Sequence, residues 1–512
     1  MQIQSYTLIS KRTLILTGFI ILKFLLQYVL ISPAYDLQRD EYLHLDQATH
    51  LAWGYLSVPP VTSWISCIIG WLGNTVFWIK FFPALFGALT IVVVWKTVET
   101  LKGNLSAQVL AAFCVLFSGL LRLNTLYQPN SLDALCWTSL YYIFIKYTDT
   151  RQRSWLYVMA VVFALGFLNK YNIAFCLLGL LPAVVLSRQR GLLSQRHFYI
   201  AMLLAFLLIL PNLAWQYYHH FPVVHHFKEL SDRQLVHVNR SDFLKSQLLF
   251  FLGSLPVIIA GLYALLTYAP FRPYRLFFWV MVFTLAVFTF LKAKDYYAIG
   301  LYPVYIAFGA VFLADVLSQG LRKYLWPVLF LFPSLVFIKM YKTVFPNRSP
   351  EYIQAHQEEY KQLGQLRWED GKDHPLPQDF ADMLGWKELA HKVDSAYATL
   401  PDSDRTLVLC DNYGQAGAIN YYTRKGVRAS SFNADYINWF DLSKPYVHLI
   451  RIKDAHNKDK ELQETAPYFQ TAMVADSITN PFARECGTTI FVFTKAKVNI
   501  IQRIKQEIAS NQ

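Results

Sequence analysis

Long apolar segments recur along the first 345 residues of this 512-residue chain and do not recur afterwards. A helix of about 20 mainly apolar residues is long enough to cross a bilayer. Windows of this length predict about eleven such helices, near residues 12–32, 76–97, 105–123, 131–147, 155–169, 171–187, 198–214, 246–268, 276–292, 296–316 and 325–342. The chain is 54% hydrophobic and 16% charged, against about 25% charged residues in soluble domains. We therefore predict a polytopic α-helical membrane protein.

Basic residues gather in every second loop between these spans. They are Lys96 and Lys102; Lys146, Arg151 and Arg153; Arg188, Arg190 and Arg196; Arg272 and Arg275; Arg322 and Lys323. Short loops rich in Lys and Arg face the cytoplasm. Lys11 and Arg12 put the N-terminus on the same side, so an odd number of spans leaves the C-terminal segment outside. The net charge of +13 follows from these loops and requires no nucleic-acid partner.

The composition changes at about residue 346, where charged residues and prolines become more frequent. Buried strands are predicted at 406–410, 446–452 and 488–494, and helices at 382–400 and 415–424. We expect two domains, a transmembrane domain over 1–345 and a soluble periplasmic α/β domain over 346–512. Cys410 and Cys486 both lie in the second domain and could pair, but their spacing does not establish a disulfide.

The distinctive polar residues fall almost entirely in loops predicted to face outward. They are Asp40, Glu41, His44 and Gln47; Asn124, Gln128, Asn130 and Asp133; Asn169, Lys170 and Asn172; His219, His220, His225, His226, Lys228, Asp232, Arg233 and His237; and the turn 292–297. This one-sidedness predicts a site at the outer membrane–water boundary, open to a hydrophobic substrate and to a polar one. Transporters commonly place such groups at midplane between repeated halves. We identify neither a repeat nor a charge deep within a span.

Two adjacent carboxylates, Asp40 and Glu41, follow the first apolar span. Residues 40–53 are predicted to form a helix lying on the membrane, with Tyr42 and Leu45 on its apolar side. A carboxylate held near low dielectric is a good general base for an acceptor hydroxyl. The alternative is that these acids cap the helix N-terminus. Capping accounts easily for one of the two.

Asp133 opens the fourth predicted span, where helix capping and function are equally good interpretations. It is a third acid on the outward side. Asp40 and Asp133 could also hold a divalent metal ion together with His226. The histidines of the long loop 215–245 lack a recognised zinc spacing, so a solvated loop is the favoured interpretation. No cofactor is certain on these grounds.

The turn that contains Lys292, Lys294, Tyr296 and Tyr297 joins two predicted spans. Lysines and tyrosines at this depth often only anchor helices at the membrane interface. Their ammonium groups would also neutralise a lipid phosphate on which charge builds as it departs. Lys80, at the outer start of the second span, could act in the same way. The functional interpretation is favoured most for Lys294.

Two glycines, Gly414 and Gly417, follow the predicted strand 406–410. Glycines in a strand-to-helix turn could admit the backbone close to a ligand. Their spacing matches neither a dinucleotide-binding nor a Walker fingerprint. A tight turn is therefore the favoured interpretation.

Five segments of the chain resemble a known family in order along the sequence. The bacterial GT-C glycosyltransferases of the dolichyl-phosphate-mannose protein mannosyltransferase type, and the related lipid A aminoarabinose transferases, are similar to RDEYLHLDQATHLAWGYLSVPPVTSW (39–64), WIKFFPALFGALTIVVVWKTVETLKG (78–103), PNSLDALCWTSLYYIFIKY (129–147), ALGFLNKYNIAF (164–175) and LKAKDYYAIGLYPVYIAFGAVFL (291–313). The segment NYGQAGA (412–418) resembles the external domain of bacterial members.

The resemblance implies a sugar donor carried on a polyprenyl phosphate, an active site on the outer face, and inversion at the anomeric carbon. The positions that match the family pattern are Asp40 and Glu41 as base and acceptor-binding groups, Asp133 as the second-loop acid, and Lys294, Tyr296 and Tyr297 as the lipid-phosphate turn. Val58 departs from the pattern, because many relatives carry a polar residue before Pro59-Pro60. The resemblance therefore does not extend to a phosphate or metal contact from position 58.

These observations predict an inner-membrane enzyme that moves a hexose or pentose from a polyprenyl-phosphate donor to an envelope acceptor on the periplasmic face. The acceptor could be lipid A, a polysaccharide or a protein. Lys80, Lys292 and Lys294 would bind the donor phosphate, and the bilayer would be the other partner. A lipid-linked sugar flippase or exporter is the alternative from another class. A non-catalytic scaffold is a third, and it would tolerate loss of Asp40, Glu41 and Lys294 together.

Overall fold

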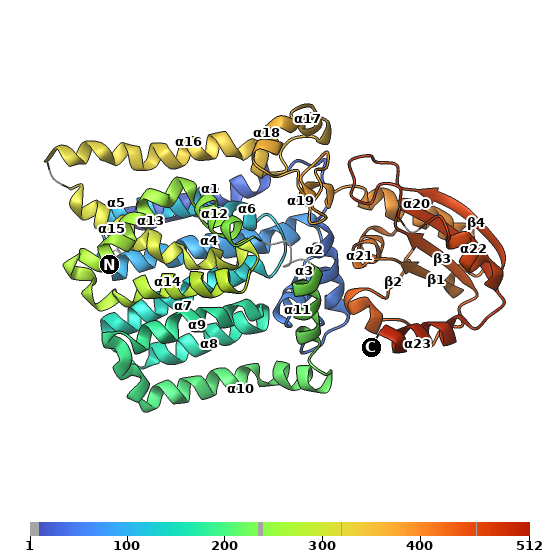
Figure 1. Ribbon diagram of the computed structural model, residues 1–512, viewed down its shortest axis with the longest axis horizontal. Helices are drawn as coiled ribbons and strands as arrows, with labels where there is room; N and C mark the ends of the chain where they lie inside the picture. The colour runs from blue at the N-terminus through green and yellow to red at the C-terminus, as the bar shows by residue number, and fades with distance from the viewer. Residues whose placement is uncertain (1–9, 234–238, 319, 457, 512) are drawn as a thin grey trace, which may run out of the picture. The chain divides into compact units, whose positions relative to one another are not determined.

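The computed structural model describes residues 10–233, 239–318, 320–456 and 458–511, and the chain divides into two compact units (Figure 1). The helical unit consists of Met1–Ile31, Val58–Thr62 and Phe77–Phe345. The α/β unit consists of Ser32–Ser57, Ser63–Val76 and Pro346–Gln512. One boundary between the units falls after Phe345, as in the predicted domain division. The prediction placed 32–57 and 63–76 with the membrane helices, whereas both segments belong to the α/β unit.

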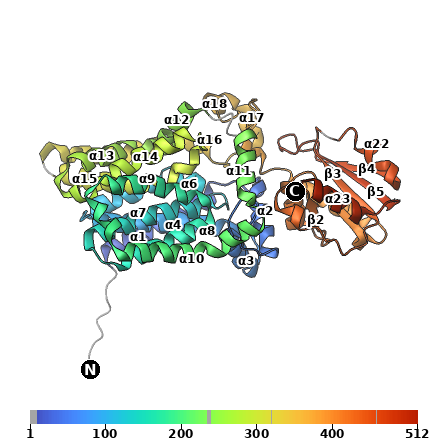
Figure 2. The same cartoon turned by 60° about the horizontal axis from the view of Figure 1, so that its bottom comes forward.

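Every predicted span coincides with a helix in the described residues. The helices are α1 (Lys11–Val29), α4 (Val76–Thr100), α5 (Leu105–Leu116), α6 (Leu120–Leu123), α7 (Asn130–Thr150), α8 (Ser154–Asn169), α9 (Ala174–Val185), α10 (Arg196–Tyr218), α11 (Pro222–Arg233), α12 (Arg240–Phe250), α13 (Leu255–Thr267), α14 (Leu276–Phe290), α15 (Pro303–Val316) and α16 (Trp326–Val344). Short 3-10 helices η2 (Tyr171–Ile173), η3 (Arg188–Ser194) and η7 (Asp295–Leu301) join some of them. Helix α8 packs between α7 and α10 (Figures 1 and 2).

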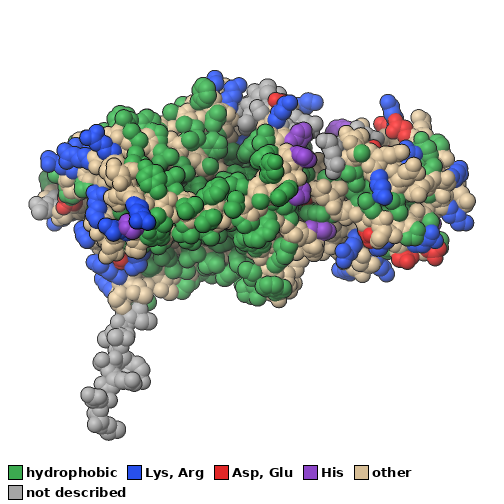
Figure 3. Space-filling model, turned by 90° about the horizontal axis from the view of Figure 1, so that it is seen from below, with side chains coloured by type: hydrophobic (Ala, Val, Ile, Leu, Met, Phe, Trp, Pro, Cys, Tyr) green, Lys and Arg blue, Asp and Glu red, His purple; other side chains and the backbone are tan. Residues whose placement is uncertain are grey.

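The helical unit has the apolar surface of a polytopic membrane protein. By length and hydropathy, four helices of the described chain can cross a membrane, or up to seven if each of three bent pairs is one span. The four are Lys11–Val29, Val76–Thr100, Arg196–Tyr218 and Gly320–Val344. Leu203 and Leu207 of α10 are 55% and 54% exposed, and Figure 3 shows a broad hydrophobic face on this unit. The number of membrane-spanning helices, about eleven, stays a prediction.

A charged residue lies deep within the first span, contrary to the expectation from sequence. Lys23 of α1 is 2% exposed, and its Nζ donates to Oε1 of Gln27 at 3.0 Å and to Oδ1 of Asn124 at 2.9 Å. Gly87 makes room for this contact, because a Cβ there would lie 2.2 Å from Asn124 Oδ1. One lysine barely lowers the mean hydropathy of a window of about 20 residues. Its hydrogen bonds to Gln27 and Asn124 offset the free-energy cost of burying an ammonium group inside a membrane helix.

The α/β unit is built on a five-stranded mixed sheet of order β2-β1-β3-β5-β4. The strands are β1 (Thr406–Cys410), β2 (Ala429–Ser431), β3 (His448–Lys453), β4 (Phe469–Ser477) and β5 (Thr489–Ala496). The helices are α2 (Arg39–Asp46), α17 (Pro350–Ala355), α18 (Gln357–Gln362), α19 (Gln378–Ala381), α20 (Trp386–Ala398), α21 (Tyr413–Tyr422), α22 (Glu461–Thr465) and α23 (Ile500–Asn511), and α3 (Val61–Trp71) has most of its length in this unit. Strand β1 is parallel to β2 and β3, and β5 is antiparallel to β3 and β4.

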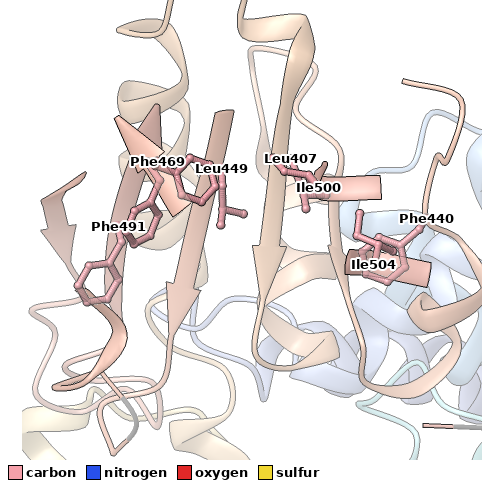
Figure 4. Close-up of a cluster of buried hydrophobic side chains, with 8 residues drawn as sticks. Leu407, Phe440, Leu449, Phe469, Phe491, Ile500 and Ile504 are labelled. Carbon is pink, nitrogen blue, oxygen red and sulfur yellow. The ribbon is translucent and has the colours of Figure 1, made fainter. Parts of the chain in front are cut away.

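Alternation along the strands gives the sheet two buried faces. Leu449 pairs with Leu407 and with Phe493, and these side chains pack with Ile500 and Ile504 of α23 (Figure 4). The residues between them in the strands point to the other face and are also buried. The predicted strands coincide with β1, β3 and β5. Strand β4 went unpredicted because its central residues are mostly exposed and show no alternation.

Helix α2 packs against α21 within the α/β unit. Tyr42 is fully buried, and its ring contacts Trp386, Tyr421 and Tyr422. The predicted helix over 40–53 is confirmed as far as Thr49, because the 3-10 helix η1 (Gln47–Thr49) directly follows α2. The prediction that its apolar side lies on the membrane is wrong, because Tyr42 and Leu45 are buried within the protein. The two glycines of α21 do not form a tight turn either, because both lie inside the helix, where Gly417 approaches Tyr42.

Gly417→Ala is expected to loosen this helix pair. A Cβ at position 417 would lie 2.6 Å from Cβ of Tyr42 and 2.8 Å from the hydroxyl of Tyr436, and overpacking of this kind costs about 1–3 kcal/mol. Thermal unfolding of the purified protein should show the loss. Gly70→Ala in α3 is the matched control, because a Cβ there meets nothing within 4 Å. Equal unfolding temperatures for both variants would contradict the close approach.

Candidate functional site

The two predicted acids after the first span have different surroundings in the α/β unit. Glu41 closes a capping box: the backbone N–H of Gln38 donates to its Oε2 at 2.7 Å, and Gln38 Oε1 accepts from the N–H of Asp40 at 2.9 Å. The side chain of Glu41 is fully buried. The capping interpretation is thus confirmed for Glu41, and Asp40 is the more accessible carboxylate.

Asp40 is oriented by residues of two elements. The hydroxyl of Tyr413, the first residue of α21, donates to Oδ1 of Asp40 at 2.6 Å. The guanidinium of Arg39 lies 4.6 Å from the centre of the Tyr413 ring, and its Nε is 3.8 Å from Oδ1 of Asp40. The Asp40 side chain is 37% exposed. The arrangement leaves a carboxylate that is held in place and is still accessible to a polar reactant.

A buried carboxylate network holds the end of α2. Oδ2 of Asp46 accepts from the Tyr436 hydroxyl at 2.5 Å and from Nδ2 of Asn420 at 2.7 Å. Burial raises the pKa of Asp46 to about 6, although these hydrogen bonds oppose the rise. Asp435 accepts from Nε2 of Gln47 at 2.9 Å and from the N–H of Leu56 at 2.7 Å. Burial likewise raises the pKa of Asp435 to about 6.

Asp435→Asn is expected to change how stability depends on pH. The pKa of Asp435 rises from 3.8 to about 6 on folding, so folding penalises its ionised form. That penalty is absent below about pH 4 and complete above about pH 6. The asparagine variant lacks it, so its unfolding free energy relative to the native protein should rise by about 3 kcal/mol from pH 4 to pH 7. Thermal unfolding at both pH values measures this change.

The pH-independent cost of the altered hydrogen bonds cancels in that comparison. Asp404→Asn, at an exposed position of the same unit, is the control and should follow the native protein. Parallel pH profiles for Asp435→Asn and the native protein would show that Asp435 is not the group that titrates.

A second polar cluster lies in the helical unit, around Asp133. Asp133 is in the first turn of α7 but does not cap it, because Oδ2 accepts from Nδ2 of Asn172 at 2.8 Å. The same Nδ2 also donates to the carbonyl of Tyr297 at 3.0 Å. In the described chain, Oδ1 of Asn172 is buried without a hydrogen-bond partner, and Oδ1 of Asp133 makes no hydrogen bond of good geometry, although the side chain of Trp137 interacts with this carboxylate. These two acceptors make this a candidate binding site, since acceptors without a well-formed hydrogen bond are costly to bury.

Ammonium groups and aromatic rings surround this carboxylate. Nζ of Lys170 donates to Oδ1 of Asn130 at 2.6 Å and lies 4.4 Å from the centre of the Tyr297 ring and 5.0 Å from that of Tyr296. Lys170 interacts electrostatically with both Asp133 and Lys294. The structure thus joins the predicted residues Asp133, Lys294, Tyr296 and Tyr297 in one cluster. It brings together two cations, which suits a phosphate group.

Other predicted site residues lie differently. Lys292 has a left-handed backbone (φ 52°), and its side chain makes no hydrogen bond or ion pair with the described residues. Lys80 is buried near the start of α4. For both lysines a phosphate-binding role stays a prediction.

No group of three or more His, Cys, Asp or Glu side chains that could hold a metal ion occurs in the described residues. The suggested ligand set of Asp40, Asp133 and His226 therefore gains no support. Cys410 is buried, Cys486 is exposed, and both are free thiols.

Lys170, Asn172 and Tyr413 belong to the clusters around Asp133 and Asp40 but are not among the site residues predicted from the sequence. Lys170 and Asn172 lie in the polar segment 169–172, directly after an apolar span. This position at the end of a predicted span is the sequence feature that could have identified them as site residues. Nothing in the sequence connected Tyr413 with Asp40, because 373 positions separate them.

Comparison with known proteins confirms the predicted resemblance. Residues 57–215 match the family model of dolichyl-phosphate-mannose-protein mannosyltransferases. The lipid A galacturonosyltransferase RgtD of Rhizobium johnstonii is 24% identical over 245 residues, which are 47% of this chain. The aligned residues are 50% of the length of this curated relative, so the chain spans about half of it.

Solved structures show the same fold over nearly the whole chain. ArnT from Cupriavidus metallidurans bound to undecaprenyl phosphate gives a TM-score of 0.61 at 12% identity, covering 96% of this chain and 99% of that one. The apo form of the same protein gives 0.60 at 12% identity, covering 94% and 98%. At this identity the similarity concerns the fold.

Proposed function

We propose that this chain, which has the fold of ArnT and matches the dolichyl-phosphate-mannose-protein mannosyltransferase family over residues 57–215, is a membrane glycosyltransferase. Its donor would be a sugar on a polyprenyl phosphate, and its acceptor a molecule of the bacterial cell envelope. The names of the similar proteins mention lipid A and undecaprenyl phosphate, which supports both choices. The active site and the α/β unit would face the periplasm, and the chain would lie in the inner membrane.

The cluster of Lys170, Lys294, Tyr296 and Tyr297 is the observation that carries this proposal. Lys170 interacts electrostatically with the carboxylate of Asp133 and with the ammonium group of Lys294, so the cluster combines two cations with one anion and its net positive charge favours a further anion. A phosphate monoester formed as the sugar departs carries growing negative charge, and cations aimed at it lower the barrier. The tyrosine rings at 4.4 and 5.0 Å from Lys170 hold one of these cations in position.

The reaction would proceed by direct displacement. Asp40 takes the proton of an acceptor hydroxyl, whose oxygen attacks the anomeric carbon of the donor sugar. The bond between that carbon and the phosphate oxygen breaks, and the electron pair leaves with the polyprenyl phosphate. One displacement inverts the anomeric centre. Glu41 would support this step by fixing the first turn of α2 that carries Asp40.

Tyr413→Phe is expected to lower kcat about 3- to 10-fold and to leave the KM for the donor unchanged. The variant keeps the ring that lies against Arg39 and removes the hydroxyl that donates to Asp40, a single hydrogen bond of modest energy. Steady-state kinetics with both substrates varied makes this comparison. A rise in donor KM with unchanged kcat would contradict a role for Tyr413 in positioning the base.

Mass spectrometry of envelope glycans and lipids from a deletion strain tests the proposed function. The product that disappears should carry one sugar fewer, and complementation should restore it. Purified protein in proteoliposomes should then transfer that sugar from its polyprenyl phosphate to the acceptor. Movement of the lipid-linked sugar across the bilayer without bond exchange would instead establish the flippase.

A further inference from the structure

A pocket of about 400 Å³ lies in the helical unit and is lined by Tyr147, Arg151, Arg153, Gln195, Arg196 and His197. Its residues come from the last turn of α7, the loop to α8 and the start of α10. Asp133 is in the first turn of the same α7, a helix of 21 residues and therefore about 30 Å long. The pocket is thus separate from the candidate donor site. Figure 3 shows Lys and Arg side chains gathered at the left end of the helical unit, beside its hydrophobic face.

The lining of this pocket is cationic and contains no carboxylate. Within the part of the chain that the structure describes, Arg151, Arg153 and Arg196 form no ion pair. Arg151 is held by a hydrogen bond of 2.8 Å from Nη1 to Oε1 of Gln189. Gln195 is held by the hydroxyl of the buried Tyr147, which donates to its Oε1 at 3.0 Å. Three uncompensated guanidinium groups therefore surround a polar floor that is already ordered.

Two helices begin at this pocket and add to its positive potential. Helix α8 starts directly after Arg153, and α10 starts directly after Gln195. Neither N-terminus has a side-chain cap, so backbone N–H groups there lack that partner. The aligned peptide dipoles place partial positive charge at both starts. Loops that face the cytoplasm are commonly basic, but that rule does not require the arginines to converge on a cavity.

We propose that this pocket binds the phosphate of an anionic phospholipid headgroup. Guanidinium groups match phosphate oxygens in geometry and charge. Basic pockets between membrane helices on the cytoplasmic side are suited to acidic lipids. A lipid is favoured over a soluble anion because α8 exposes Val158, Val161 and Leu165, and α10 exposes Met202 and Leu203. These side chains continue from the pocket along the helices, where acyl chains would lie.

Native mass spectrometry of the full-length protein in detergent tests this inference with phosphatidylglycerol and phosphatidylethanolamine as probes. The protein should retain phosphatidylglycerol in preference to the zwitterionic lipid. Arg153→Gln/Arg196→Gln should lower that affinity on the order of 25-fold, about fivefold for each arginine near the headgroup. This variant leaves the bond between Arg151 and Gln189 intact. Should the double variant fail to fold, Arg153→Glu, at an exposed position, should have the same effect.

The matched control is Arg322→Gln/Lys323→Gln, which removes two charges from the exposed η8 segment Gly320–Leu325. It should keep the affinity for phosphatidylglycerol. Equal loss in both double variants, or no loss in either, would overturn the proposal, since binding would then reflect overall charge. Displacement of the bound lipid by millimolar inorganic phosphate would also overturn it, in favour of a site for a soluble anion.

Discussion

Asp40→Asn should reduce sugar transfer by a factor of 10² to 10⁴, the range that a positioned general base contributes. The change removes the only group that we assign to accept the acceptor proton. It should leave the fold intact, because the asparagine amide oxygen can still accept from the Tyr413 hydroxyl, which lies 2.6 Å from Oδ1 of Asp40 in the native protein. Turnover measured with purified protein, donor and acceptor gives the effect, and thermal unfolding confirms that the variant is folded.

The neighbouring Glu41→Gln variant is a stringent control. Both substitutions remove one negative charge from adjacent positions of α2. Glutamine can keep the capping contact with the backbone N–H of Gln38, so turnover should fall by less than about tenfold. The opposite result, with Glu41→Gln inactive and Asp40→Asn active, would transfer the base role to Glu41. Full activity in both variants would remove the proposed mechanism.

Lys294→Gln should weaken binding of the polyprenyl-phosphate donor by about 10- to 100-fold, the range for a lost hydrogen bond to a charged group. Lys294 interacts electrostatically with Lys170, which lies against the rings of Tyr296 and Tyr297. Because Asp133 already offsets one positive charge of this cluster, loss of Lys294 removes the net positive charge that would face the phosphate. Because negative charge builds on the leaving phosphate, kcat should fall as well. Titration with undecaprenyl phosphate measures the affinity.

Lys292→Gln provides a comparison two residues away in the same turn. If Lys170 and Lys294 hold the donor phosphate without Lys292, this variant should bind the donor within about twofold of the native protein. A larger loss would support the phosphate-binding role that the sequence predicts for Lys292. Equal losses in both variants would mean that only the total charge of the turn matters. Unchanged affinity in Lys294→Gln would remove the phosphate role of that residue.

Features that depend on local sequence were predictable. Each apolar span is a helix because hydropathy over about 20 residues is a local property. Strands β1, β3 and β5 were found for the same reason, since they are short apolar runs bounded by polar residues. The capping role of Glu41 was also foreseeable, because it needs only contacts three residues apart. The candidate acids and the turn of Lys294 came from residue type and predicted side.

Features that depend on distant partners were not predictable from these patterns. The apolar side of α2 indicated only that it meets something apolar, and the tertiary structure provides α21 where the prediction expected lipid. Lys23 lies inside the predicted span 12–32, but its partner Asn124 could not be predicted, because it is 101 positions away. Strand β4 is an edge strand whose pairing with β5 replaces the missing alternation.

The sequence by itself determined which segments are apolar helices and which residue types stand in the loops between them, and it predicts the side of the membrane on which those loops lie. Only the tertiary structure decided which of them meet. Nδ2 of Asn172 donates hydrogen bonds both to the carboxylate of Asp133 and to the carbonyl of Tyr297, which is 125 positions further along the sequence. The hydroxyl of Tyr413 donates a hydrogen bond to Asp40, although 373 positions of the sequence separate the two residues. Hydropathy and helix propensity act over a few turns, whereas hydrogen bonds and charge pairs depend on distance in space, which folding alone sets.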